Sequence, residues 1–212
     1  HAELVAALEQ TLEETPLPDA VARAGWLQLA RWQRDRLGDL EAAERSASRA
    51  VALDPTEDGW ALTCELRRDL EHPALRAALL ELDARRPRPL DALQEAARLV
   101  LRDDAAGPER VALLERLHRK AAQMWMRNEA TTGTLEPASV AQWSLDRLVE
   151  LHVAAGHSAR AVDALIDGTR LPLEATRATE MRRRAAEMLA EHGQRGRAIE
   201  IYRAVLEARP DD

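Results

Sequence analysis

Residues 38–55, which read GDLEAAERSASRAVALDP, decide the fold. Three alanines, Ala43, Ala47 and Ala50, recur at spacings of four and three residues. On a helix they line one stripe, which lets a neighbouring helix approach closely. Gly38 favours a tight turn before the helix, because glycine adopts positive φ at little steric cost. Pro55 ends the helix, since proline lacks an amide hydrogen and clashes with the preceding turn.

Helix breakers of the same character recur along the whole chain. Successive turn signals are separated by 34, 35, 49 and 37 residues, and they fall at Gly38, His72-Pro73, Gly107-Pro108, Gly156 and Gly193. A period of this length is typical of repeated helical hairpins. The long interval contains residues 128–137, a polar stretch with glycine, threonine and proline that predicts an inserted loop.

The spacing predicts where the helices lie. The first helices of the hairpins are predicted at 19–36, 57–71, 90–103, 138–155 and 175–192. The second helices are predicted at 40–53, 74–85, 108–127, 158–171 and 195–208. The hairpins are then 19–55, 57–87, 90–127, 138–172 and 175–210, and residues 1–16 are the second half of a preceding, truncated hairpin. We therefore predict an all-α fold, a single right-handed superhelical array of helix-turn-helix hairpins over residues 1–212.

This pattern resembles a known repeat family. Residues 38–55 resemble the second half of a tetratricopeptide repeat at Gly38, Ala43, Ala50, Leu53 and Pro55. Residues 26–30, Trp-x-x-Leu-Ala, are similar to the Trp-x-x-Leu-Gly opening of that repeat, although the stretch from there to Gly38 is one residue longer. The pattern returns after Gly156 and Gly193, whereas the hairpins at 57–87 and 90–127 keep only the period.

The resemblance implies a function. Members of the family stack their hairpins into a superhelix, and they bind peptides, helices or protein domains on a concave face lined mostly by first helices. It therefore implies a non-catalytic scaffold that binds another protein. Two alternatives stay open: a regulatory or sensory segment that acts in cis within a larger enzyme such as a kinase or protease, and a structural spacer that self-associates through its exposed array ends.

Basic residues supply the first candidate contacts. Family members that hold a carboxylate often use asparagine and lysine on first helices, but the only such residues here are Asn128 and Lys120, which lie elsewhere. Arginine also pairs with carboxylates in a bidentate manner. The best candidates are Arg182, Arg183 and Arg184 in the last first helix. The alternative is a solvated helix face balanced by the neighbouring Glu180 and Glu187.

Large apolar side chains supply the others. Met124, Trp125 and Met126 are consecutive in an otherwise amphipathic helix, so at least one of them is expected to be exposed. Trp125 and Met126 are candidate partner contacts, with packing beneath the 128–137 loop as the alternative. Trp32 follows Trp26 by six residues and lies roughly 120° around the helix from it, which predicts an exposed or repeat-interface position and makes Trp32 a further candidate partner contact. The other tryptophans of first helices, Trp26, Trp60 and Trp143, are expected in the core.

Composition excludes several classes of protein. The chain has 212 residues and a formal charge of −7, which disfavours a nucleic-acid binder because phosphate contacts need a basic face. No apolar run approaches the roughly 18 residues that cross a bilayer, so membrane insertion is not expected. The single cysteine, Cys64, allows no intrachain disulfide, and we expect an inert, partly buried thiol. A chain that starts at His1 without a signal-type segment is expected to be a piece of a larger protein, and its single cysteine is compatible with the cytoplasm.

Enzyme signatures are not found in the sequence. It contains no glycine-rich phosphate loop and no dinucleotide-binding fingerprint. His157 and Ser158 are adjacent on a turn and point apart, and Ser158 is better explained as a helix N-cap. We expect no catalytic site, no cofactor and no metal.

Overall fold

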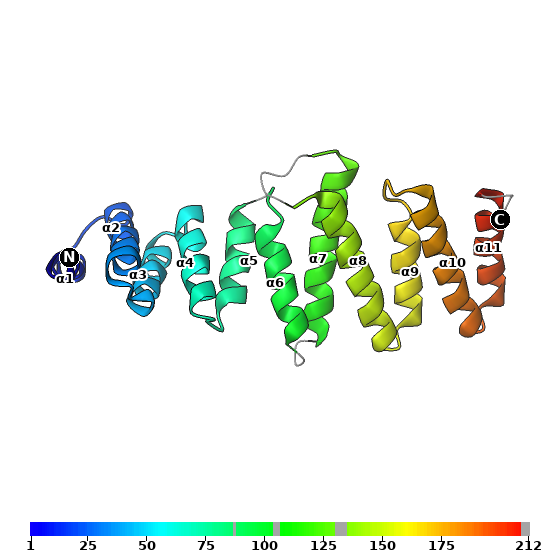
Figure 1. The fold of residues 1–212 in the computed structure, drawn as a ribbon, viewed down its shortest axis with the longest axis horizontal. Coiled ribbons are helices and arrows are strands. Elements are labelled where there is room, and N and C mark those ends of the chain that lie inside the picture. The colour runs from blue at the N-terminus through cyan, green and yellow to red at the C-terminus, as the bar shows by residue number, and fades with distance from the viewer. Residues whose placement is uncertain (87, 104–106, 130–134, 209–212) are drawn as a thin grey trace. The chain divides into compact units, whose positions relative to one another are not determined.

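A computed structural model describes residues 1–86, 88–103, 107–129 and 135–208. All regular secondary structure in these residues is helical (Figure 1). The elements are α1 (Ala2–Glu14), α2 (Asp19–Trp32), η1 (Gln33–Leu37), α3 (Leu40–Leu53), α4 (Glu57–Asp69), α5 (Leu75–Arg85), α6 (Asp91–Arg102), α7 (Gly107–Met126), α8 (Pro137–Ala154), α9 (Ser158–Gly168), α10 (Ala175–Glu191) and α11 (Arg195–Ala208).

The predicted all-α fold of helical hairpins is confirmed. Each predicted helix is present, and the predicted ends of α3 and α11 coincide with the observed ones. The predicted loop at 128–137 falls partly on residues 130–134, outside the described residues. The chain divides into two compact units, His1–Leu99 and Val100–Asp212. The handedness of the array and its extent as one domain stay predictions.

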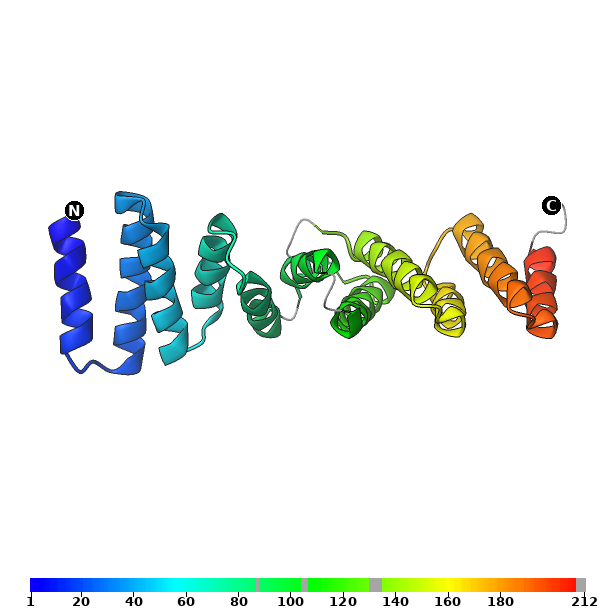
Figure 2. The same cartoon turned by 90° about the horizontal axis from the view of Figure 1, so that it is seen from below.

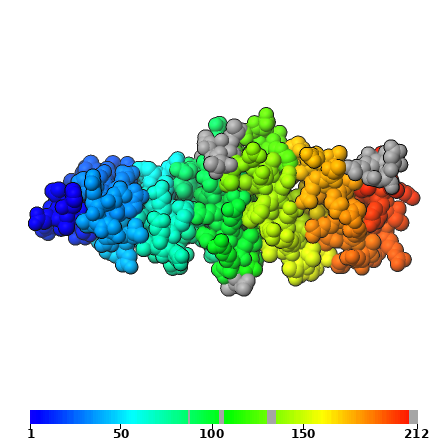
Figure 3. All heavy atoms as spheres, viewed as in Figure 1, coloured from blue at the N-terminus to red at the C-terminus, as the bar shows by residue number. Residues whose placement is uncertain are grey.

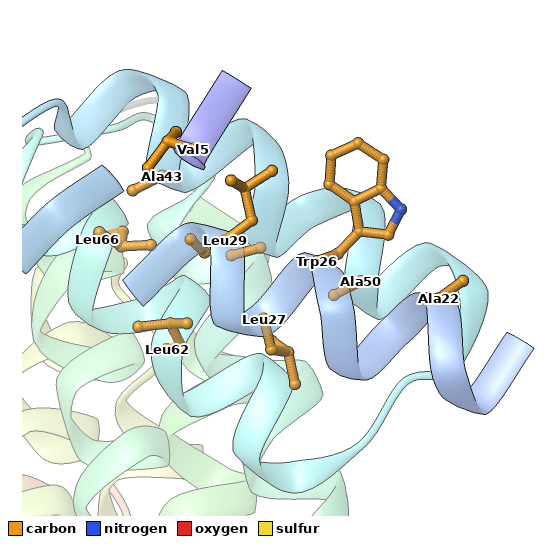
Figure 4. Close-up of a cluster of buried hydrophobic side chains, with 11 residues drawn as sticks. Val5, Ala22, Trp26, Leu27, Leu29, Ala43, Ala50, Leu62 and Leu66 are labelled. Carbon is orange, nitrogen blue, oxygen red and sulfur yellow. The ribbon is translucent and has the colours of Figure 1, made fainter. Parts of the chain in front are cut away.

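In the first unit the helices from α1 to α5 pack in chain order, each against the next (Figure 2). Its core takes buried side chains from α1, α2, α3 and α4 (Figure 4). Ala43, Ala47 and Ala50 have no exposed surface, so the alanine stripe is the contact surface of α3. Trp26 is buried in the same cluster, as predicted.

In the second unit α7 to α11 also pack in chain order, and the space-filling view shows them in continuous contact (Figure 3). A core cluster draws on α8, α9, α10 and α11. Gly168 at the end of α9 lets these helices approach, because a Cβ there would overlap Leu145 of α8 and Met181 of α10. The helix contacts thus follow the same small-residue rule in both units.

The hairpin turns share one backbone device. Gly38, Gly156 and Gly193 have φ angles of 67°, 72° and 75°, so each glycine of the predicted turns is left-handed. After Gly156 and Gly193 the next amide donates to a carbonyl five residues back, at 2.8 Å in both cases, which satisfies carbonyls that the helix end leaves free. In the second hairpin, which has no turn glycine, Glu71 takes this conformation with a φ of 49°.

The first hairpin differs by one residue, and a π-helical turn absorbs the difference. The stretch between the opening at 26–30 and Gly38 is one residue longer than in the resembled repeat. The extra residue widens the end of the first helix into η1, and the amide of Asp39 donates to the carbonyl of Gln33, six residues back, at 3.0 Å. A one-turn π-bulge is the usual way for a helix to hold an extra residue.

Candidate partner-binding groove

The predicted arginine cluster lies on α10. Consecutive residues are about 100° apart around a helix, so the three arginines do not share a face. Arg182 is half-buried, whereas Arg183 and Arg184 are exposed. The Arg183 guanidinium hydrogen-bonds Glu180 at 2.6 Å and also pairs with Glu187, and its hydrogen bonds hold the pKa of the Glu180 carboxyl below its usual value. Arg183 is therefore engaged within its own helix, and a partner-binding role for the cluster stays a prediction.

The methionine–tryptophan run is divided between core and surface. Met124 is buried, Trp125 is half-buried, and Met126 is 56% exposed. The expectation that at least one of the three is exposed is confirmed, and Met126 is that residue.

Trp26 and Trp32 lie on different sides of α2, as their spacing predicts. Trp32 is half-buried against the first core, and it lines a cavity of about 190 Å³ together with Leu4 and Val5 of α1. It therefore lies on the side of α2 that faces the neighbouring helix α1, which is the repeat interface. Trp60 and Trp143 were predicted in the core, but they are only half-buried and do not belong to the buried core residues.

A groove of about 620 Å³ runs along α7, α8 and α9. Its two walls are the second helices α7 and α9, and α8 is its floor. The resemblance implied a binding surface lined mostly by first helices, so this groove was not predicted. Its one signal in the sequence analysis was Met126, a candidate partner contact that lines it.

The floor of the groove is apolar except for one imidazole. Leu145, Leu148 and His152 lie at spacings of three and four residues on one face of α8, and each is 4% exposed. Met126 stands at the rim at the end of α7. A flexible thioether at the rim of an apolar groove adapts its shape to what enters.

Two histidines of the groove are uncharged near neutral pH. Burial lowers the pKa of His152, and the Arg160 guanidinium lowers it further against the opposing effect of Glu115. The Nδ1 atom of His152 is buried without a hydrogen-bond partner in the described structure. Burial also lowers the pKa of His118, whose Nδ1 lies 3.0 Å from the Ala141 carbonyl oxygen and so donates to it.

The walls carry charges of both signs. Both aspartates of α9 form ion pairs. The Asp163 carboxylate lies 3.8 Å from the Arg197 guanidinium, and the Asp167 carboxylate lies 3.3 Å from the Arg170 guanidinium. Arg119 on α7 and Arg160 on α9 are exposed, and among the contacts of the described residues neither has an ion-pair or hydrogen-bond partner. The groove therefore offers a guanidinium group on each wall.

The first helices, by contrast, are tied to one another by ion pairs. In the first unit Arg34 of η1 lies 3.1 Å from Glu65 of α4, and Arg68 of α4 lies 2.7 Å from Glu95 of α6. In the second unit Arg177 of α10 lies 2.8 Å from Asp146 of α8. These six charged residues of first helices thus pair with one another between hairpins.

The predicted role of Ser158 is wrong. His157 is the N-cap residue of α9, without a side-chain cap hydrogen bond. The hydroxyl of Ser158 instead lies 2.7 Å from Nε2 of His192, whose Nδ1 lies 2.7 Å from the Met188 carbonyl oxygen. The reason is tertiary: the next hairpin brings the end of α10 beside the start of α9, and its imidazole competes for the hydroxyl.

Other chemistry has few places in the described residues. No group of three or more histidine, cysteine, aspartate or glutamate side chains there has the arrangement to hold a metal ion. Cys64 is buried, and burial raises the pKa of its thiol to about 11, so it is protonated and unreactive at neutral pH. In the part of the chain that the structure describes, no helix combines the length and apolar character needed to cross a membrane.

Three solved structures match the backbone of this chain over most of its length at low sequence identity. Two structures of MamA have TM-scores of 0.42 and 0.41, each at 13% sequence identity; they cover 89% and 84% of this chain and 92% and 93% of their own. A putative kinesin light chain from Podosopora anserina, described as having nearly identical TPR-like repeats, has a TM-score of 0.39 at 16% identity and covers 92% of this chain and 97% of its own. No protein-family model and no curated protein matches the sequence. The repeat character of the chain rests on its own period, hairpins and left-handed turns.

Proposed function

We propose that this chain is a non-catalytic protein-interaction module that binds a partner protein in the groove formed by α7, α8 and α9. The observation that carries the proposal is the groove itself, with an apolar floor, an exposed methionine at the rim and charged walls. This combination of an apolar centre and a polar rim is the usual anatomy of a protein interface.

The rim methionine is the sharpest feature of this surface. Met126 is 56% exposed although its neighbour Met124 is buried, and it borders the groove rather than standing alone. Exposed apolar side chains beside a concave surface are enriched at protein-binding sites. Trp125 and the arginines at 182–184 are then secondary candidates outside the groove.

Photocrosslinking tests the proposal at single residues. Met126 and, as a probe of the alternative surface on α10, the exposed Arg184 are each replaced by p-benzoylphenylalanine in the full chain, and both variants are irradiated in native lysate. We expect one protein to be crosslinked from position 126 and not from position 184. The captured protein is then purified, and its affinity for the wild-type chain is compared with that for Met126→Glu.

The two positions separate the possible outcomes. A purified partner that binds the wild type and loses at least tenfold in affinity to Met126→Glu supports the proposal. A partner crosslinked only from position 184 moves the interface to α10. If position 126 crosslinks only to a second copy of this chain, the groove mediates self-association and the proposal of a partner protein is wrong.

Self-association has its own observation and is the second candidate. Ile199 and Leu206 of α11 are 50% and 58% exposed and lie seven residues apart on one helix face. Concentration-dependent sedimentation that Leu206→Glu abolishes would support it.

A further inference from the structure

We infer that the partner segment bound by the α7–α8–α9 groove is an amphipathic helix whose apolar stripe is flanked by carboxylates on both sides. This inference rests on the proposed function and specifies the chemistry of the partner. Three properties of the groove support this inference: its length, its apolar floor, and the charged groups of its walls that have no ion-pair partner.

The length of the groove fits about three helical turns. On the α7 wall the lining residues run from Glu115 to Met126, which is roughly 16 Å at a rise of about 1.5 Å per residue. The α9 wall runs from Arg160 to Leu171, which is the same number of residues. A helix lying in this groove would pack on α8 between two helices, and its anchors would be apolar residues at i, i+3 or i+4, and i+7.

The floor selects apolar anchors. Leu145 and Leu148 are already almost fully buried, so an entering side chain meets packed hydrocarbon. The neutral imidazole of His152 is the one polar group among the nearly buried residues of the floor. A charge pressed against this floor would lose its hydration without a partner, which is costly. The charged residues of the bound helix therefore belong at its flanks.

The walls select the sign of those flanking charges. Asp163 and Asp167 are engaged by arginines, as described above. What remains without a partner among the described contacts is Arg119 on one wall, Arg160 on the other, and Glu115 one turn before Arg119. Among the charged groups of the walls without an ion-pair partner, two guanidinium groups therefore stand against one carboxylate, with one arginine on each side. Carboxylates on both flanks of the bound helix complement this arrangement, because arginine pairs with carboxylates in a bidentate manner.

Three synthetic helical peptides of about 15 residues test this specificity. The acidic probe has a leucine stripe flanked by glutamates, the basic probe has lysine at each glutamate position, and the third has serines that interrupt the stripe. Each is labelled, and its affinity for the full chain is measured by fluorescence anisotropy at about 50 mM and about 200 mM salt. We expect the acidic probe to bind at least about tenfold more tightly than the basic one, with the difference shrinking at the higher salt.

Charge-matched variants locate the effect. Arg119→Glu with Arg160→Glu is compared with Arg45→Glu with Arg195→Glu, which changes the net charge equally at exposed positions outside the groove. The groove variant should lose the preference for the acidic probe, and the control variant should keep it. Circular dichroism confirms that both variants fold.

The outcomes distinguish the inference from the function it rests on. Equal binding of acidic and basic probes, abolished by Met126→Glu, would overturn the charge specificity and leave the groove as a binding site. If no probe binds but a partner is crosslinked from position 126, the inference of an acidic helical partner is wrong and the proposed function stands. Failure of every probe and of crosslinking at position 126 would overturn both.

Discussion

Single residues set the geometry of each hairpin through their backbone conformation. Gly38, Gly156 and Gly193 are left-handed, and a Cβ added at any of them would meet no atom within 4 Å. The φ angle alone therefore favours glycine at these turns. Glu71 adopts the same left-handed φ region, although it has a Cβ. This conformation costs a residue other than glycine roughly 1–2 kcal/mol.

Glu71→Gly should therefore stabilise the protein. The side chain of Glu71 is exposed, so the substitution relieves the backbone while removing little else. We expect the free energy of unfolding in urea to rise by about 0.5–1 kcal/mol, after allowing for the greater freedom of glycine in the unfolded chain. Glu71→Ala, which keeps the strained φ, should stay close to wild type. A Glu71→Gly protein no more stable than Glu71→Ala would contradict the strain.

At the scale of elements, helix ends follow from single residues but grooves do not. The glycines and prolines that end these helices act locally, so α3 and α11 could be predicted to the residue. The sequence also showed the extra residue before Gly38, but it did not predict that a π-helical turn would accommodate this residue. Ser158 was misassigned because its partner, His192, comes from another hairpin. The groove was missed for the same reason, since its floor and walls come from three helices.

The π turn makes a prediction about chain length. Arg36 lies exposed in η1, after the last core contact of α2 and before Gly38. Its deletion should return the turn to the five-residue hydrogen bond seen after Gly156 and change the free energy of unfolding by less than about 1 kcal/mol. Deleting buried Thr63 in the middle of α4 rotates everything after it by about 100° and should prevent folding. Circular dichroism and thermal melting distinguish the two deletions.

The histidines of the second unit predict how its stability depends on pH. The pKa values of His118 and His152 are lowered in the folded chain, so the unfolded chain binds more protons just below the usual value of about 6.5. Stability should therefore be full above that pH and fall as the pH decreases through it. The carboxylates with lowered pKa, Glu44 and Glu180 among them, lose their contribution only in a more acidic range.

Urea unfolding at about pH 7.5 and about pH 5.5 measures this effect. The double variant His118→Gln with His152→Gln should lose less stability between the two pH values than the wild type does. His1→Gln, which changes an exposed histidine, should behave as wild type. Equal losses in wild type and double variant would show that the buried histidines do not govern acid sensitivity in this range.

At the scale of the whole molecule, an array of hairpins gains its stability mainly from contacts between neighbours. A defect in one unit should then remain largely local. Ala47→Trp overpacks the alanine stripe of α3 and should destabilise its hairpin by about 1–3 kcal/mol. Ala52→Trp, on the exposed side of the same helix, should change little.

Hydrogen exchange shows how far the defect spreads. In Ala47→Trp the amides of α2, α3 and α4 should lose protection, whereas those of α9 and α10, in the other compact unit, should keep it. An even loss of protection along the chain would mean that the two units unfold as one.

The ion pairs between successive first helices also bear on mechanics. Each pair is exposed and worth little alone, and dissolved salt weakens it further. The alanine and glycine contacts beneath, being uncharged, do not share this sensitivity. Pulled along its row of helices, each unit should therefore extend under a smaller force at high salt than at low salt, while its hairpins remain folded.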